Sequence, residues 1–139
     1  MVGAREHVLK SCEFARKASG LKHFREIGSD RKRMYLKALP RRFNKLKPFL
    51  ELAKVFRYSE GTIEFIDGYL RRVRPALVIV DDHLYPVLGY SRKLKEGSVH
   101  RDDLKKLVVI ADNLANYFRI LLRNDPKKFR EELRKFEKG

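Results

Sequence analysis

Residues 29–50 read SDRKRMYLKALPRRFNKLKPFL and hold eight Lys or Arg but only one acid. On a helix with about 100° per residue, their apolar side chains fall on one side at steps of three and four positions. These apolar residues are Leu36, Leu39, Phe43, Leu46 and Leu50. The spacing predicts a helix that packs against the rest of the protein along this side.

The opposite side of this helix carries cations at steps of four, which we call the basic ridge: Arg33, Lys37, Arg41 and Lys45. Like charges four positions apart destabilise a helix by about 0.2–0.5 kcal/mol per pair, and no acid lies between residues 31 and 50 to relieve them. A helix with a purely structural role would interleave Glu, as residues 126–139 do. We expect Pro40 to bend the helix, which would suit a clasp around a cylinder.

The basic ridge fits phosphate binding, because Lys and Arg neutralise phosphates and release counterions whatever the base sequence. The nucleic-acid-binding residues predicted on this ground are Arg16, Lys17, Arg31, Lys32, Arg33, Lys37, Arg41, Arg42 and Lys45. Gln, a usual adenine reader, is absent, and few aromatic residues alternate with the cations as single-strand binding requires. We therefore expect the backbone of a duplex as the ligand. A merely solvated face and a helix lying on a membrane surface are the alternatives.

The excess charge is concentrated in the first part of the chain. The 139 residues carry a formal net charge of +15. Residues 1–57 hold 16 basic and 5 acidic residues, whereas residues 58–139 hold 17 and 13. Such asymmetry is typical of a polyanion-binding segment joined to a more neutral one.

The C-terminal part of the chain reads as helical. From Ile63 to Val87 apolar residues recur at alternating steps of three and four. This spacing predicts one long bent helix, or two or three coaxial ones, over roughly 60–95 with Ser59 as N-cap. A wide apolar stripe predicts a further long helix that stops at Asn124. Asp125–Pro126 then opens a last short helix.

The N-terminal part predicts a helix over residues 3–18 and another that begins at Pro48. The expected fold is therefore all-α. A basic helical arm over residues 1–47 would contact nucleic acid, and residues 48–139 would form an antiparallel, four-helix-type bundle.

No motif predicts catalysis. Asp81–Asp82–His83 is the most suggestive polar cluster, but no second His lies three or four positions away, so a metal would need a distant ligand such as His100. Cys12 is the single cysteine and cannot form an internal disulfide. We therefore predict no enzymatic activity, no cofactor and no metal site.

The sequence also bears on location. No apolar run approaches the roughly 20 residues of a membrane span, and the first ten residues, MVGAREHVLK, carry charges where a signal peptide would be apolar. We expect a protein of a virion, or otherwise of the cytoplasm or nucleoid, that is not secreted.

A basic helical arm followed by a bundle, in a chain of this length and composition, resembles the α-helical major capsid proteins of filamentous viruses of hyperthermophilic archaea. In that family paired capsid proteins wrap double-stranded DNA, and basic N-terminal helices clasp a duplex held in the A form. The resemblance implies that cations within residues 5–47 contact the duplex. It also implies that the protein partner is a homologous coat subunit or a second copy, in a dimer and higher assemblies.

The predicted function is thus non-enzymatic, sequence-independent binding and packaging of double-stranded DNA, as a virion coat subunit. The first alternative is a small DNA-binding regulator or chromatin protein of an archaeon or its virus. The others are a helical module that binds an acidic protein surface and a helical-bundle nuclease.

Overall fold

The computed structural model describes residues 1–56 and 61–138, in which helices dominate and two small sheets are added. The α-helices are α1 (Glu6–Leu9), α2 (Cys12–Ala18), α3 (Lys32–Leu46), α4 (Thr62–Val73), α5 (Asp102–Asn124) and α6 (Pro126–Phe136). The strands are β1 (Val2–Gly3), β2 (Leu52–Ala53), β3 (Val78–Val80) and β4 (Lys93–Lys95). The mostly helical character predicted from the sequence is confirmed.

The chain divides into two compact units. Unit 1 comprises Met1–Val55 and Asp102–Gly139, and unit 2 comprises Phe56–Arg101. The basic N-terminal segment therefore shares a unit with α5 and α6, and the predicted boundary between residues 47 and 48 falls inside that unit. Of the helices after this boundary, α4 belongs to unit 2 and the other two to unit 1.

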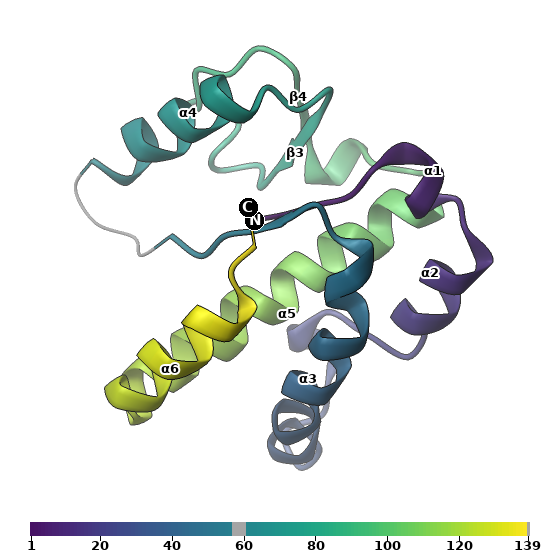
Figure 1. Ribbon diagram of the computed structural model, residues 1–139, viewed down its shortest axis with the longest axis vertical. Helices are drawn as coiled ribbons and strands as arrows, with labels where there is room; N and C mark the ends of the chain where they lie inside the picture. The colour runs from purple at the N-terminus through teal and green to yellow at the C-terminus, as the bar shows by residue number, and fades with distance from the viewer. Residues whose placement is uncertain (57–60, 139) are drawn as a thin grey trace. The chain divides into compact units, whose positions relative to one another are not determined.

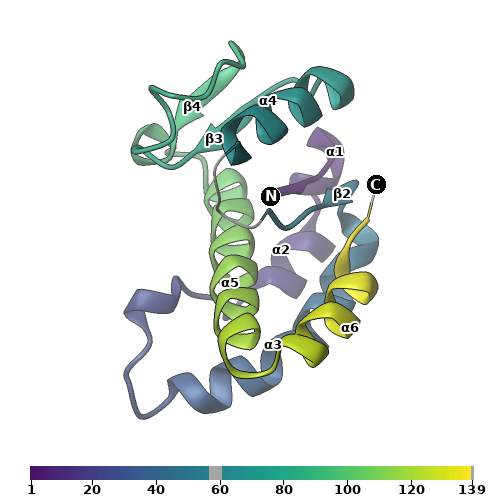
Figure 2. The ribbon, with the colours of Figure 1, turned by 90° about the vertical axis from the view of Figure 1, so that its left-hand side faces the viewer.

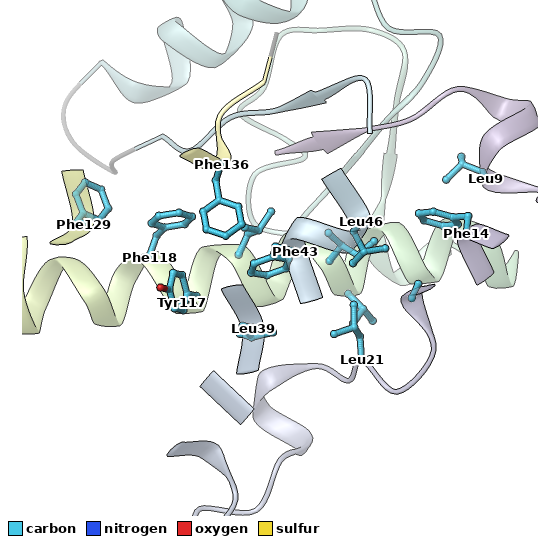
Figure 3. Packing of buried hydrophobic residues seen from close by; sticks show 14 residues of the cluster. Leu9, Phe14, Leu21, Leu39, Phe43, Leu46, Tyr117, Phe118, Phe129 and Phe136 are labelled. Atoms are coloured by element: carbon cyan, nitrogen blue, oxygen red, sulfur yellow. The ribbon is translucent and has the colours of Figure 1, made fainter. Parts of the chain in front are cut away.

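The core of unit 1 forms around α5, against which α2, α3 and α6 pack (Figures 1 and 2). Figure 3 shows its interior, where Phe43 of α3 meets aromatic rings of α5 and α6. The rings of Phe43 and Phe136 lie edge to face with centroids 5.4 Å apart. Phe118 meets Phe129 in the same way at 5.8 Å. The predicted long helix that ends at Asn124 and the short one after it are confirmed as α5 and α6.

Two helices replace the single helix expected over residues 3–18. Ser11 separates them, because its Oγ accepts a hydrogen bond from the backbone N–H of Phe14 at 3.2 Å and so caps α2. Leu9, Phe14 and Ala18 are the buried side chains of this segment.

The helix predicted after Pro48 is wrong. A short 3₁₀ turn over Lys47–Phe49 leads instead into β2, which pairs antiparallel with β1 so that Val2 faces Ala53. Ala53 also exchanges two backbone hydrogen bonds of 3.0 Å with Lys138. Both ends of the described chain thus satisfy backbone groups of this segment, a pairing that no local pattern could indicate.

The single long helix, or series of coaxial helices, predicted over 60–95 is also wrong beyond α4. Its expected N-cap, Ser59, lies outside the described residues. Unit 2 holds α4 and a two-stranded parallel sheet of β3 and β4. The helix ends because Arg74 adopts the left-handed conformation, with φ 54° and ψ 57°, and Pro75 follows it. The apolar residues beyond Pro75 therefore serve β3 and the turns after it.

Candidate nucleic-acid interface

The apolar side of α3 fixes the helix to unit 1. Leu39, Phe43 and Leu46 are at most 3% exposed, and Leu50 beyond the helix is also buried. The predicted packing side is therefore confirmed. Pro40 lies inside α3, and the helix runs through it without a break.

A polar network holds the first half of α3 against α5. The hydroxyl of Tyr35 donates a hydrogen bond to Asn113 Oδ1 and accepts one from the backbone N–H of Lys22. The amide nitrogen of Asn113, which is fully buried, donates to the carbonyls of Lys22 and Val109 at 2.8 and 2.9 Å. Burial raises the pKa of Tyr35, so the hydroxyl keeps its proton at neutral pH. The orientation of α3 is thus set by both apolar and polar contacts.

The basic ridge faces solvent along its whole length. Arg33, Lys37, Arg41 and Lys45 are all exposed. Within residues 1–56 and 61–138, none of these four side chains makes an ion pair or a hydrogen bond with another described residue. At the helical rise the ridge spans about 18 Å. It is a line of four cations, carried by a packed helix and open to a ligand.

The other predicted cations on or beside α3 differ in their surroundings. Arg31 is exposed just before the helix. The ammonium of Lys32 lies 4.9 Å from the ring centroid of Phe24, and the guanidinium of Arg42 lies 5.7 Å from that of Tyr35. Both side chains are half-buried. Lys32 therefore contacts the segment between α2 and α3, whereas Arg42 contacts a ring of its own helix, and both add positive charge.

Arg16 and Lys17 lie in the last turn of α2, which packs on α3. Both are exposed, but Arg16 forms an ion pair with Glu13 at 3.8 Å. Cations at this end of a helix also offset its dipole. The structure therefore brings these two residues into the same unit as the basic ridge and gives Arg16 a local partner.

Two uncharged side chains on the outward side of α3 were not among the predicted site residues. Met34 is 77% exposed, and Asn44 is also exposed. Together with Lys37 and Arg41 they follow steps of three, four and three. This spacing is visible in the sequence, but attention to charge alone passes over it.

The cluster Asp81–Asp82–His83 serves local structure in unit 2. The carboxylate of Asp81 accepts a hydrogen bond from the backbone N–H of His83 at 2.8 Å, and that of Asp82 accepts one from Gly97 at 3.3 Å. Across the described part of the chain, no group of three or more His, Cys, Asp or Glu could hold a metal ion. These side chains stabilise turns.

Among the described residues, no helix is both long enough and apolar enough to span a membrane. Comparison with protein-family models, with curated proteins and with solved structures found no match to this chain.

Proposed function

We propose that the protein binds and packages double-stranded DNA without sequence preference, as a coat subunit of a filamentous virion. The observation that carries this proposal is the basic ridge: four exposed cations without partners among the described residues, on a helix whose other side is firmly packed. The helix contains six Lys or Arg and no acid.

Duplex DNA is a suitable ligand for such a line of charge. An 18 Å length of duplex carries about ten phosphate charges, so four cations meet an excess of partners. Because α3 is already ordered by its packing, binding does not require the helix to fold first. The resemblance to filamentous-virus capsid proteins supports the same ligand.

The coat hypothesis also needs contacts between subunits, and unit 2 offers apolar surface for them. Of the six large apolar side chains that are exposed in the described chain, Met34 belongs to unit 1. The others lie in unit 2 and are Phe65, Val73, Leu77, Val87 and Leu94. Exposed apolar side chains in such number favour a protein contact. The partner would be a second copy or a homologous coat subunit.

A titration of binding against salt tests the proposal. Duplexes of unrelated sequence should bind with similar affinity, and the log–log slope should be about −3.6 if four cations each contact one phosphate. Replacing Arg33, Lys37, Arg41 and Lys45 together by Glu should abolish binding while the far-ultraviolet circular dichroism stays unchanged. A flat salt dependence would refute phosphate binding.

The coat hypothesis is tested separately by electron microscopy of the protein mixed with long linear duplex DNA. Continuous filaments are expected, whereas a DNA-binding regulator would occupy discrete sites. A module that binds acidic proteins would not bind DNA, so neither filaments nor particles at discrete sites would be seen.

A further inference from the structure

The exposed face of α4 has a glycine at its centre that the fold of unit 2 does not require. Gly68 lies in the middle of α4 and is exposed, and Gly at such a position destabilises a helix relative to Ala. A Cβ added there would meet no side chain and no distant backbone atom within 4 Å. The backbone of α4 is therefore open to close approach by another molecule at this point.

Charged and aromatic side chains flank Gly68 on both sides. At about 100° per residue, Glu64 and Arg71 lie about 40° and 60° to one side of Gly68. Arg72 and Phe65 lie about 40° and 60° to the other side. All four are exposed, and Phe65 is 74% exposed. The buried side chains of α4 lie at least about 100° away around the helix, so these four and Gly68 form one outward face.

The charges of this face are ordered along the helix. Its acid, Glu64, belongs to the first turn, whereas Arg71 and Arg72 belong to the last. Within residues 1–56 and 61–138, the side chains of Glu64 and Arg71 make no ion pair or hydrogen bond. The guanidinium of Arg72 lies 5.4 Å from the ring centroid of Tyr69. A face with an acidic start and a basic end is complementary to the same face in the reverse direction.

A twofold axis at Gly68 would pair these side chains between two copies of α4. In such an antiparallel pair, a residue before Gly68 lies opposite one that follows Gly68 on the same side of the second copy. Glu64 then meets Arg71, and Phe65 meets Arg72, each with an offset of about 1.5 Å along the helices. A parallel pair would instead place Arg71 beside Arg72 of the second copy, where like charges repel.

We propose that α4 docks antiparallel against α4 of a second copy of this chain, about a twofold axis at Gly68. Glu64 forms an ion pair with Arg71 of the other copy, and the ring of Phe65 packs against the guanidinium of Arg72. This contact specifies the subunit contact of the proposed coat function, but α4 alone carries the inference and no DNA is needed. Two 12-residue helices give less than the roughly 1,600 Å² of a standard interface, so we expect a dissociation constant on the order of 10–100 μM.

Sedimentation equilibrium of the protein without DNA tests the contact. A reductant is present because Cys12 is exposed, and about 0.15 M salt screens charges beyond about 8 Å. A monomer–dimer equilibrium is expected, and a monomer at about 1 mM would overturn the inference. Phe65→Ser should weaken the dimer about tenfold or more. The matched control is Met34→Ser in α3, whose side chain is 77% exposed; an equal loss in this variant would overturn the place of the contact.

Reversal of single charges tests the pairing. Glu64→Arg and Arg71→Glu should each weaken the dimer about fivefold or more, and a 1:1 mixture of the two variants should associate as the wild type does. In each variant chain both positions carry the same sign, so attraction between them arises only between chains. A mixture that associates no better than either variant alone would overturn the antiparallel pairing.

The role of Gly68 is tested by Gly68→Leu. Leu is the better helix former, so the midpoint of urea unfolding should rise while the dimer weakens about tenfold or more. An unchanged dissociation constant would overturn the close approach at Gly68. Because these measurements contain no DNA, a monomeric wild type would overturn this inference and leave DNA binding standing. Loss of the salt-dependent DNA binding would refute the proposed function and leave the dimer standing.

Discussion

Reversing one charge of the basic ridge should raise the free energy of unfolding and, at the same time, lower the affinity for DNA. Lys37 is four positions from both Arg33 and Arg41, so it takes part in two repulsive pairs, and all three side chains are exposed. Lys37→Glu removes both repulsions and creates two attractive pairs. Each removed repulsion and each new attraction stabilises the helix by about 0.2–0.5 kcal/mol. The free energy of unfolding should therefore rise by about 1 kcal/mol.

In the proposed complex with duplex DNA, the same substitution removes one phosphate contact. Losing one contact lowers the log–log salt slope by about 0.9, which corresponds to about an eightfold loss of affinity at 0.1 M salt relative to 1 M. The introduced carboxylate repels phosphate, so the total loss should exceed this. The neutral variant Lys37→Gln separates the effects, since it should show the lower slope with about half of the stabilisation.

Urea unfolding followed by circular dichroism and fluorescence anisotropy with a labelled duplex measure the two quantities. Arg130→Glu provides the matched control, because it changes the net charge equally at an exposed site of α6. It should leave the salt slope unchanged. If Lys37→Glu destabilises the protein, the basic ridge is not a solvent-facing line of like charges; if affinity and slope are unchanged, it does not contact phosphate.

Three further predictions concern the scaffold. Arg74→Gly should raise the free energy of unfolding by about 1 kcal/mol in urea titration, because Gly adopts the left-handed conformation at the end of α4 without steric cost; a loss of stability would contradict this. Tyr35→Phe should cost about 1–3 kcal/mol, because it leaves Asn113 Oδ1 without its donor. Since burial raises the pKa of Tyr35, its contribution is complete below about pH 10 and lost as the pH rises through the higher folded-state pKa. The variant should therefore show a smaller alkaline loss of melting temperature, and an equal loss would contradict this account. Phe118→Ala should cost about 3–5 kcal/mol, because this fully buried ring contacts the rings of Phe129 and Phe136; a cost below 1 kcal/mol would contradict its central place.

The helices that were predicted well are those whose apolar spacing and capping residues all lie within the helix itself or next to its ends. In α3 and α5 an apolar stripe of helical period persists for three or more turns, and α6 also has Asp125 and Pro126 at its start, where Asp125 accepts a hydrogen bond from the N–H of Lys128 at 3.2 Å. Such signals require no knowledge of distant residues.

The failures have a different physical origin. Steps of three and four continue from α4 past Pro75, yet one left-handed residue, Arg74, ends the helix, and β3 pairs with β4 some 15 positions later. The strand β2 depends on β1, about 50 positions earlier. Strand pairing between short segments leaves little trace in the local pattern, because strands of two or three residues are too short to show alternation.

The positions of the exposed cations in the candidate site could be predicted from the sequence, but the contacts of the neighbouring cations could not. The spacing of Arg33, Lys37, Arg41 and Lys45 is enough to indicate a shared exposed side, and the structure places all four there. The half-buried state of Lys32 and Arg42 is not predictable in this way. Lys32 lies over the ring of Phe24, which reaches it only once the segment between α2 and α3 has folded, and Arg42 lies over the ring of Tyr35 in the same helix.

An acid-free ridge persists because the other side of the same helix supplies more stability than the ridge removes. Three repulsive pairs cost about 0.6–1.5 kcal/mol together. Leu39, Phe43 and Leu46 are almost completely buried, and burying each contributes about 1.5–3 kcal/mol. The packing of α3 therefore exceeds the repulsion by several kcal/mol, so the ridge needs no internal Glu to keep the helix folded. An internal Glu would lower the repulsion, but it would also remove positive charge from the face that we propose to contact phosphate. The absence of acids is thus expected of a helix selected for binding an anion and not for stability alone.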